Sequence, residues 1–435
     1  MLGPKGNSQA LGRARRSSDL SRHRSAGAGM AGFPSNKTRG ITKQRRDVDM
    51  RRRSASPDVE PFTTFILGAG FSKCAGLPLQ DEFAALLLSE EFDTELDKVI
   101  TDALQEFLKV GFGWNKGHPL PALEDMFTCI DLAAGSGHNL GIRKYTPKVL
   151  RAIRRLAIHR IFSVLDRRFS YSSDIETLLR NFCPSESPDC AFVVLNWDIV
   201  LEKHIQPVLP MAPIDYRCFS FDWNTRQATS IGHGIPICKM HGSSNWVYCD
   251  NCKSLFFDLD QKLPLQTKAG LIKADFRLLD ERFTNSKFDE ALGIPPEARS
   301  CRFCGFPVSS HIATFSYIKS FRTHAYPSVW YHAERLLADS SHWIFIGYSL
   351  PEADFELKQV LISASLRMQH RRAKAKKVID VIVLNDLRTP KKYEAFLGAD
   401  NFRCFQGGIP DYLHSGQGQD GTTALSLAGQ TCQLR

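Results

Sequence analysis

Residues 62–78 have the sequence FTTFILGAGFSKCAGLP, and this stretch decides the fold class. Its first six residues, Phe62–Leu67, are β-branched, aromatic or aliphatic and predict a buried strand. Gly68-Ala69-Gly70-Phe71-Ser72 follows the strand directly, and glycines there permit positive φ angles and a close backbone approach to a ligand. A helix after this turn would direct its first N–H groups towards a pyrophosphate.

The turn departs from two standard phosphate-binding patterns. Lys73 stands where the dinucleotide fingerprint has its third glycine, and the Gly-Lys-Ser/Thr of a nucleoside-triphosphate loop is missing from this stretch. The stretch therefore predicts either a phosphate-binding turn of another type or a tight strand–helix turn that binds nothing.

Short apolar strands alternate with amphipathic helices along the rest of the chain. Strands are expected at Ala191–Leu195, Pro236–Lys239, His342–Ile346 and Val378–Leu384, and helices over 79–110, 144–168, Val329–Ala338 and Glu352–Met368. Strands that are apolar throughout and separated by helices indicate an α/β fold with a parallel sheet covered on both faces. Residues 79–180 look helical throughout and predict an inserted helical subdomain. Residues 244–320 contain few long apolar runs and look like a small module held by something other than a core.

The positive charge belongs to one tail. The chain has 435 residues, 56 Lys+Arg, 46 Asp+Glu and a formal net charge of +10, but residues 1–53 hold 14 basic and 3 acidic residues. The remaining body is therefore close to neutral, which argues against nucleic acid as its partner. Residues 1–60 and 415–435 have the composition of disordered tails and flank a body spanning 61–414.

The basic tail has three interpretations. It is a solvated tail or an upstream extension of the gene model, since Met30 and Met50 are both candidate starts; or an Arg/Ser-rich transit peptide; or a polybasic contact for nucleic acid or an anionic surface. No apolar run reaches membrane-spanning length, so we expect no membrane partner. Free thiolates at a metal favour a reducing compartment, and we expect an intracellular protein of the cytoplasm or nucleus.

Three further strand ends carry polar or small residues. Asn196 and Asp198 follow the second expected strand, His241-Gly242 follows the third, and Gly347-Tyr348-Ser349 follows the fourth. A fifth strand ends at Asn385. In open parallel sheets ligands bind beyond the carboxyl ends of the strands, so these residues are candidates for one site. The alternatives are helix capping by Asn196 or Asp198 and an ordinary surface or core histidine at 241.

Two C-x-x-C pairs, Cys249/Cys252 and Cys301/Cys304, predict a structural zinc site with four thiolates. The residues between the pairs, 253–300, exceed the usual spacing and require an insertion. A reducible disulfide and iron–sulfur ligation are the alternatives, and nothing else in the sequence supports either.

In their order these motifs resemble the sirtuin superfamily. The order is G-A-G-x-S-x-x-x-G-x-P, N-x-D, H-G, C-x-x-C twice, G-x-S-L and a strand ending in Asn, over roughly residues 62–405. The phrases around Leu195–Glu202, Lys239–Trp246 and Gly347–Asp354 look more like the broader sirtuin-like group found in uncharacterised and defence-associated proteins.

The resemblance implies NAD in a Rossmann-like cleft beside a structural zinc. Asn196 would hold the nicotinamide ribose, Asp198 the carboxamide, and His241 would be the catalytic base. The pyrophosphate would be lined by Gly68, Ala69, Gly70 and Ser72, with Gly76 completing the motif, and the adenosine half would be held by Gly347, Ser349 and Asn385.

The sequence departs from the protein-deacylase pattern on the peptide side. Leu79-Gln80-Asp81 stands for Asp-Phe-Arg, Leu195 stands for Gln, and residues 312–317 differ from the segment that pairs with acyl-lysine peptides. We therefore expect an enzyme that cleaves the nicotinamide–ribose bond of NAD, with water as nucleophile: an NAD hydrolase.

Three other hypotheses stay open. The chain is an NAD-dependent protein-lysine deacylase with an acyl-lysine protein as partner; or an inactive NAD- or ADP-ribose-binding scaffold with structural zinc; or, least favoured, a nucleic-acid binder. A homo-oligomer or a partner bound through residues 79–180 is a further expectation.

Overall fold

The computed structural model describes residues 62–415 except 90, 92–93, 184–188, 230, 280–297, 311, 313–324, 353 and 372–376. Some of the expectations from the sequence concern residues outside this set: the basic tail 1–60, the C-terminal tail after 415, part of the 253–300 insertion and most of 312–317.

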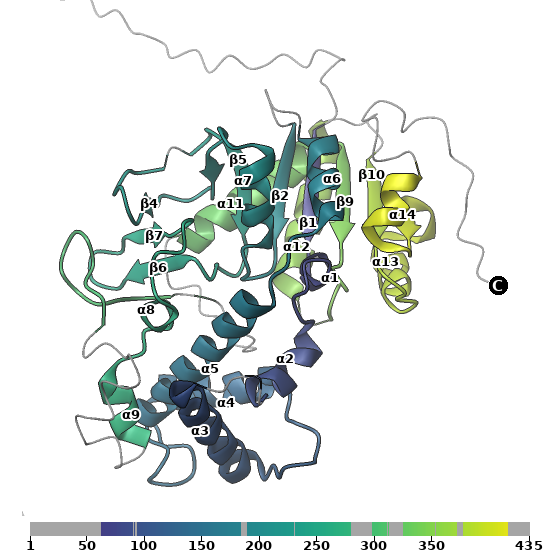
Figure 1. Ribbon diagram of the computed structural model, residues 1–435. Coiled ribbons are helices and arrows are strands. Elements are labelled where there is room, and N and C mark those ends of the chain that lie inside the picture. Colours follow the sequence, from purple (N-terminus) through teal and green to yellow (C-terminus); the bar gives the residue numbers. More distant parts are fainter. Residues whose placement is uncertain are drawn as a thin grey trace, which may run out of the picture. The chain divides into compact units, whose positions relative to one another are not determined.

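A seven-stranded parallel sheet forms the centre of the described chain (Figure 1). Its strand order is β11-β10-β9-β1-β2-β5-β3, with β1 Thr63–Leu67, β2 Cys190–Val194, β3 Ile214–Asp215, β5 Ile235–Lys239, β9 His342–Ile346, β10 Val378–Ile382 and β11 Arg403–Phe405. All five residues of β1 are buried, as expected for a central strand that is covered on both faces. The predicted α/β fold with a parallel sheet is confirmed.

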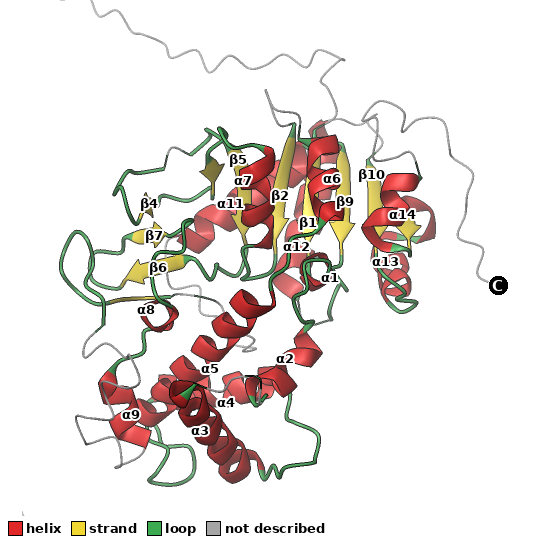
Figure 2. Ribbon diagram, in the orientation of Figure 1, coloured by secondary structure: helices red, strands yellow, loops and turns green. Residues whose placement is uncertain are grey.

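Helices cover both faces of this sheet (Figure 2). On one face lie α6 Ser173–Phe182, α7 Val200–Val208 and α14 Gly408–His414, and on the other α11 Ala325–Asp339 and α12 Phe355–Arg371. The short α1 Ala69–Lys73 follows β1, and α13 Thr389–Leu397 and the 3-10 turn Ala399–Asn401 precede β11. Within the described residues, no helix is long and apolar enough to span a bilayer.

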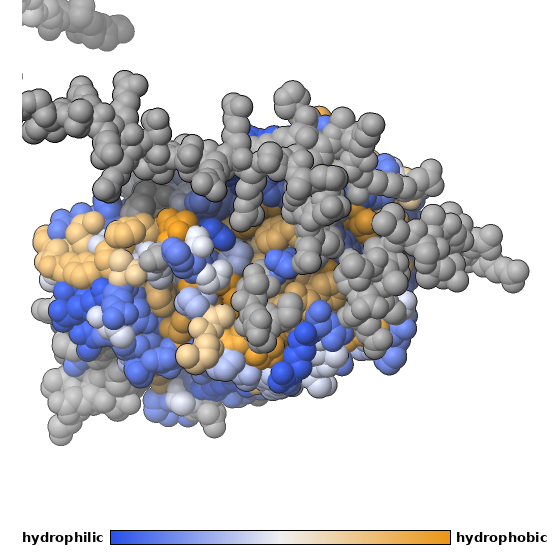
Figure 3. Space-filling view, turned by 90° about the horizontal axis from the view of Figure 1, so that it is seen from above, coloured by the Kyte–Doolittle hydropathy of each residue, from blue (hydrophilic) through white to orange (hydrophobic). Residues whose placement is uncertain are grey.

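The chain order places a switch point at the centre of the sheet. From β1 the chain builds β2, β3 and β5 on one side, then returns to β9 on the other side of β1. Ligands of open α/β sheets bind at the carboxyl end of such a point. Figure 3 shows the molecule from above, where the described surface carries both apolar and polar residues.

A group of helices with its own apolar core follows β1 in the chain. It contains α2 Gln80–Leu87, α3 Glu95–Phe112, α4 Leu123–Ser136 and α5 Pro147–Arg168, whose fully buried residues include Ile100, Phe107, Phe127 and Leu156. The single helix expected over 79–110 is two helices, because α2 ends at Leu87 and a new N-cap, Thr94, begins α3 by accepting from the Asp97 N–H. The next helix, α6, instead packs its Ile175, Leu178 and Leu179 into the sheet core.

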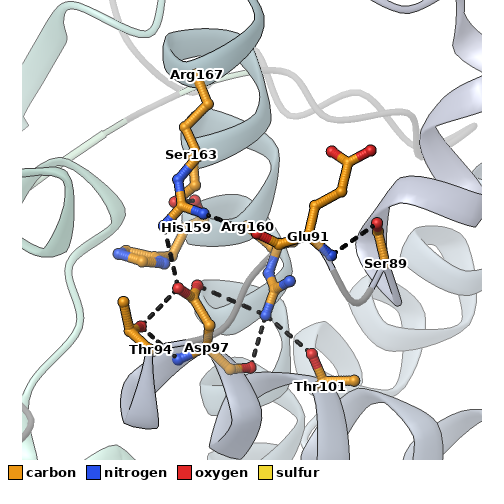
Figure 4. A network of polar contacts seen from close by, with 9 residues as sticks. All are labelled: Ser89, Glu91, Thr94, Asp97, Thr101, His159, Arg160, Ser163 and Arg167. Carbon is orange, nitrogen blue, oxygen red and sulfur yellow. Dashed lines mark hydrogen bonds and ion pairs between the residues drawn. The ribbon is translucent and has the colours of Figure 1, made fainter.

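A buried ion pair joins α3 to α5 (Figure 4). Arg160 is fully buried and donates to Asp97 O at 2.7 Å and to Thr101 Oγ1 at 3.0 Å. Arg167 lies 3.1 Å from the Asp97 carboxylate. A buried charge without such partners would be strongly destabilising, so this network fixes the two helices against each other.

The residues around the cysteine pairs form a second, four-stranded sheet, contrary to the expectation of a module without a core. Its order is β4-β7-β6-β8, with β4 Phe221–Asp222, β6 Trp246–Cys249, β7 Leu255–Phe257 and β8 Val308–Ser309. Trp223, Val247, Phe256 and Leu263 form a small apolar cluster with the cysteines. The helices α8 Leu265–Ala269 and α9 Lys273–Leu279 follow and pack on α5.

Candidate functional site

The carboxyl ends of β1 and β2 share one hydrogen-bond network. Ser72 donates its hydroxyl hydrogen to Asp198 Oδ2 at 2.7 Å, and Asn196 Nδ2 donates to Ser72 Oγ and to Gly68 O, each at 2.9 Å. Ser72 and Asp198 are buried, and Asn196 is half-buried. Residues more than 120 positions apart in the chain therefore meet at the edge where the sequence predicted a site.

Asp198 also caps the following helix, as the alternative interpretation expected. Its Oδ1 accepts the Val200 N–H at 3.0 Å at the start of α7. Capping accounts for this oxygen but not for the bond from Ser72 to the other one. Both N–H groups of the Asn196 amide donate within the network, while its Oδ1 accepts no hydrogen bond from the described residues.

His241 lies on the neighbouring loop, after β5. Its Nδ1 is 3.0 Å from Leu195 O, one residue before Asn196. A carbonyl can only accept, so the neutral ring carries its proton on Nδ1 and its lone pair on Nε2. The ring is half-buried, and the Tyr326 hydroxyl donates to the His241 carbonyl at 3.3 Å. This tautomer is the one that can take up a proton at Nε2.

The glycines at the switch point serve a close contact between two loops. The Gly68 and Gly70 N–H groups donate to Ile346 O at 3.0 Å and Gly347 O at 2.9 Å. A Cβ added to Gly68 would lie 2.5 Å from Gly347 O, and one added to Gly70 would lie 2.6 Å from Gly347 Cα. Two amides that the sequence argument directed at a pyrophosphate are therefore engaged within the protein, and the ligand-lining role of this turn stays a prediction.

The other predicted cofactor residues lie around this edge without joining the network. Ser349 is exposed two residues beyond Gly347, and Asn385 is exposed beyond β10 with its N–H bonded to Gln406 O. Ala69 begins α1 and is half-buried. Gly76 has φ +82°, and a Cβ there would lie 2.7 Å from Arg168 O, so its glycine is explained by packing against the end of α5.

A small cavity of about 30 Å³ lies beside Asp198. Leu77, Phe169, Ser244 and Lys268 are among the residues that bound it, so it lies between the strand-end loops and the helices α5 and α8. This volume holds about one water molecule. A ring the size of nicotinamide would require these elements to separate.

The four cysteines of the two pairs form one cluster. Their Sγ atoms all lie within 4.8 Å of one another, with 3.5 Å from Cys249 to Cys304 and 3.6 Å from Cys252 to Cys301. Tetrahedral thiolates at the Zn–S distance of about 2.3 Å stand about 3.8 Å apart. The donor set and spacing fit zinc, whose place here would be structural because four protein thiolates leave no open position.

Two buried charged residues behind the site were missed by the sequence argument. Lys239, the last residue of β5, donates to the Asp198 carbonyl and lies 3.5 Å from Glu202 on α7. Charged residues are rarely fully buried, so a lysine at a strand end predicts a surface position. No local signal in the sequence could have found this pair, because its two members lie on different elements and only the fold brings them together.

The fold and the site define an α/β protein with a polar hydrogen-bond network at the switch point of a parallel sheet and a four-cysteine module. No family model matches the chain, and no curated protein matches it. The solved structures that match include Sir2 homologues. A Sir2 homologue mutant in complex with 2'-O-acetyl ADP ribose is 13% identical, with a TM-score of 0.38 over 85% of this chain and 94% of that chain.

Two further matches are of the same kind. A Sir2 homologue–NAD complex is 13% identical, with a TM-score of 0.37 over 84% of this chain and 92% of that chain. A Sir2 bound to an acetylated peptide is 12% identical, with a TM-score of 0.33 over 82% and 93%. Likeness at this level does not assign an activity, so we base the functional assignment on the geometry of the strand ends.

Proposed function

We propose that this protein binds NAD at the carboxyl edge of its parallel sheet and cleaves the bond between nicotinamide and ribose, with water as the acceptor. The observation that supports this proposal is the meeting of Ser72, Asn196, Asp198 and the His241 loop at one edge. Cleavage of this bond develops positive charge on the ribose carbon, as in glycoside hydrolysis. The protein must therefore orient the ribose, hold the carboxamide of the departing nicotinamide and admit one water molecule.

The residues suit these tasks in distinct ways. Asn196 Oδ1 is an acceptor for a ribose hydroxyl, because its two N–H groups are already used. Asp198, fixed by Ser72, has remaining lone pairs to accept from the carboxamide N–H. His241, with its lone pair on Nε2, would accept a proton from a hydroxyl of the ribose or of water. The four-cysteine cluster would hold zinc and stabilise the small sheet without touching the reaction.

Product analysis tests the proposal. The full-length chain is incubated with NAD, with and without acyl-lysine peptides, and nicotinamide and ADP-ribose are quantified. We expect nicotinamide release from NAD alone. His241→Ala and Asn196→Ala should each abolish it while the chain stays folded, whereas His138→Ala, at an exposed histidine that follows α4, should not.

Other outcomes assign the alternatives. Release that strictly requires an acyl-lysine peptide makes the protein a deacylase. Stabilisation by NAD without product at high enzyme concentration makes it a binding scaffold. Wild-type rates in both His241→Ala and Asn196→Ala refute the site.

A further inference from the structure

A line of buried polar groups runs directly behind the strand-end network. Lys239 is fully buried, its Nζ donates to the Asp198 carbonyl, and it lies 3.5 Å from Glu202 Oε1. Glu202 is 1% exposed, and burial raises the pKa of its carboxyl while the charge of Lys239 opposes that rise. Lys239 therefore contacts the turn that carries Asn196 and Asp198, and Glu202 lies beside Lys239.

The line continues from Glu202 towards the four-cysteine module. The Tyr216 hydroxyl donates to Glu202 Oε1 at 3.2 Å, and Asn245 Nδ2 donates to the Tyr216 oxygen at 3.0 Å. Tyr216 and Asn245 are fully buried. Asn245 immediately precedes β6, whose last residue is Cys249. The 195–198 turn, α7 and the module are thus joined by side chains with no access to solvent.

Hydrogen bonds near Lys239 join two segments of the candidate site, residues 195–198 and residues 239–244. Three carbonyls of the 195–198 region accept from the 239–244 segment: Leu195 O from the His241 ring, Trp197 O from Ser244 N at 2.7 Å, and Asp198 O from Lys239. Only the last of these contacts uses a charged side chain. Lys239 therefore ties the turn that holds Asn196 to the loop that holds His241.

Stability alone does not account for a lysine and a glutamate at these positions. Removing two charges from water is costly, and a buried ion pair replaced by apolar residues of similar volume is often as stable or more so. Glu202 Oε2 has no hydrogen-bonding partner among the described residues, which adds to that cost. A contact that is costly to bury and ends on the backbone of the site points to a role in geometry.

We propose that Lys239 and Glu202 are positioning residues, which hold the Asn196–Asp198 turn and the His241 loop at the spacing that NAD cleavage requires. The inference rests on the proposed function for its reaction, and on the contacts above for its geometry. Neither residue is assigned contact with the substrate.

The decisive variant removes both charges at once. Lys239→Met or Glu202→Gln alone leaves a buried group without its partner and should lower the unfolding midpoint, by roughly 4–7 °C for the lysine. The double variant Lys239→Met/Glu202→Leu should return to near the wild-type midpoint. Its kcat for nicotinamide release should nevertheless stay at least about tenfold low, because small displacements of reacting groups cost that much or more. KM for NAD should change less, since the adenosine half would bind elsewhere along the edge.

Arg160→Met is the matched control. Arg160 is as buried as Lys239 and pairs with Asp97 in the helical core, away from the strand ends. It should lose stability like Lys239→Met while the folded enzyme keeps its kcat. A double variant with wild-type stability and wild-type kcat overturns the inference, and so does an equal loss of kcat in Arg160→Met.

Failure of the proposed function would be visible separately. If the wild-type chain releases no nicotinamide under any condition, that function fails, and the positioning role is then measured by calorimetric titration with NAD. A loss of NAD affinity in the stable double variant supports the role, and wild-type affinity overturns it.

Discussion

Gly347→Ala is the substitution for which the structure gives the sharpest expectation. Gly347 has φ +61°, and a Cβ added there would lie 2.3 Å from the Cα and C of Gly70 and from Phe71 N. Ordinary carbon contacts begin near 3.4 Å, so the loops after β1 and β9 would have to separate by about 1 Å. Every atom in conflict is backbone, so no side chain can rotate away to relieve it.

The magnitude has two parts that a matched control separates. A non-glycine residue in the left-handed region costs about 1–2 kcal/mol, and overpacking adds about 1–3 kcal/mol, so Gly347→Ala should cost roughly 2–5 kcal/mol of unfolding free energy. Gly137 ends α4 with φ +78° and has nothing within 4 Å of an added Cβ. Gly137→Ala therefore incurs the first part alone.

Equilibrium urea denaturation of both variants measures the two costs. The difference between them should be at least about 1 kcal/mol, the lower bound for overpacking. Equal costs for Gly347→Ala and Gly137→Ala would refute the close approach of the two loops, and with it the packing requirement for glycine at positions 68 and 70. NAD titration of the Gly347 variant adds a second measurement, since opened loops should bind NAD more weakly.

Three further predictions concern other parts of the structure. The purified chain should contain one zinc per molecule by elemental analysis. Cys304→Ser should lose this zinc, whereas Cys74→Ser, which changes a cysteine outside the cluster, should keep it. A wild-type chain that binds no metal under zinc-replete conditions would contradict the assignment. Burial lowers the pKa of His159 to about 4, so below pH 6.5 the unfolded chain takes up a proton that the folded chain does not. The free energy of unfolding should then fall by up to about 3 kcal/mol between pH 6.5 and 4, and His159→Gln should remove that component of the slope. Ser72→Ala leaves Asp198 Oδ2 without its donor and should cost about 1–3 kcal/mol and slow nicotinamide release, whereas Ser163→Ala, which removes a buried hydroxyl from α5, should leave the rate unchanged.

The strands of the central sheet were the most predictable part of the fold. His342–Ile346 was predicted to the residue, and β1 and β2 within one residue, because a strand buried on both faces consists mostly of apolar and β-branched residues. The two- and three-residue strands β3, β4, β7, β8 and β11 had no such signal. They exist because a longer neighbour offers a row of backbone groups, which a local pattern does not encode.

The small sheet was missed for a related reason. Its apolar residues, among them Trp223, Val247 and Phe256, come from three separate segments, each too short to form a periodic pattern. Only the fold brings them together with the cysteines. The C-x-x-C spacing predicted the cluster itself, because the chemistry of four thiolates is local to each pair.

The candidate site, too, was predictable from the sequence only in part. The meeting of Ser72, Asn196 and Asp198 could be predicted from one rule, that the carboxyl ends of parallel strands share an edge. The bond between the His241 ring and Leu195 O depends on which two strands are neighbours, β2 and β5, and the sequence does not reveal strand order. Lys239 and Glu202 were out of reach, since burial of a charge is decided by its partner rather than by its neighbours in the chain.

The glycine motif shows that a sequence pattern can mark the switch point of a sheet because of contacts within the protein rather than because of a bound ligand. The pattern after Leu67 predicted either a phosphate-binding turn or a tight strand–helix turn, and Gly68 and Gly70 are required by contact with the Gly347 loop whether or not a phosphate binds. That contact occurs between the loops of β1 and β9, the two strands at which the chain reverses direction across the sheet. Glycines at both loops therefore mark the switch point itself, and the switch point is where an α/β sheet offers a crevice. The motif predicts the location of a ligand site through the fold, and the identity of the ligand depends on the side chains around it: Asn196, Asp198 and His241.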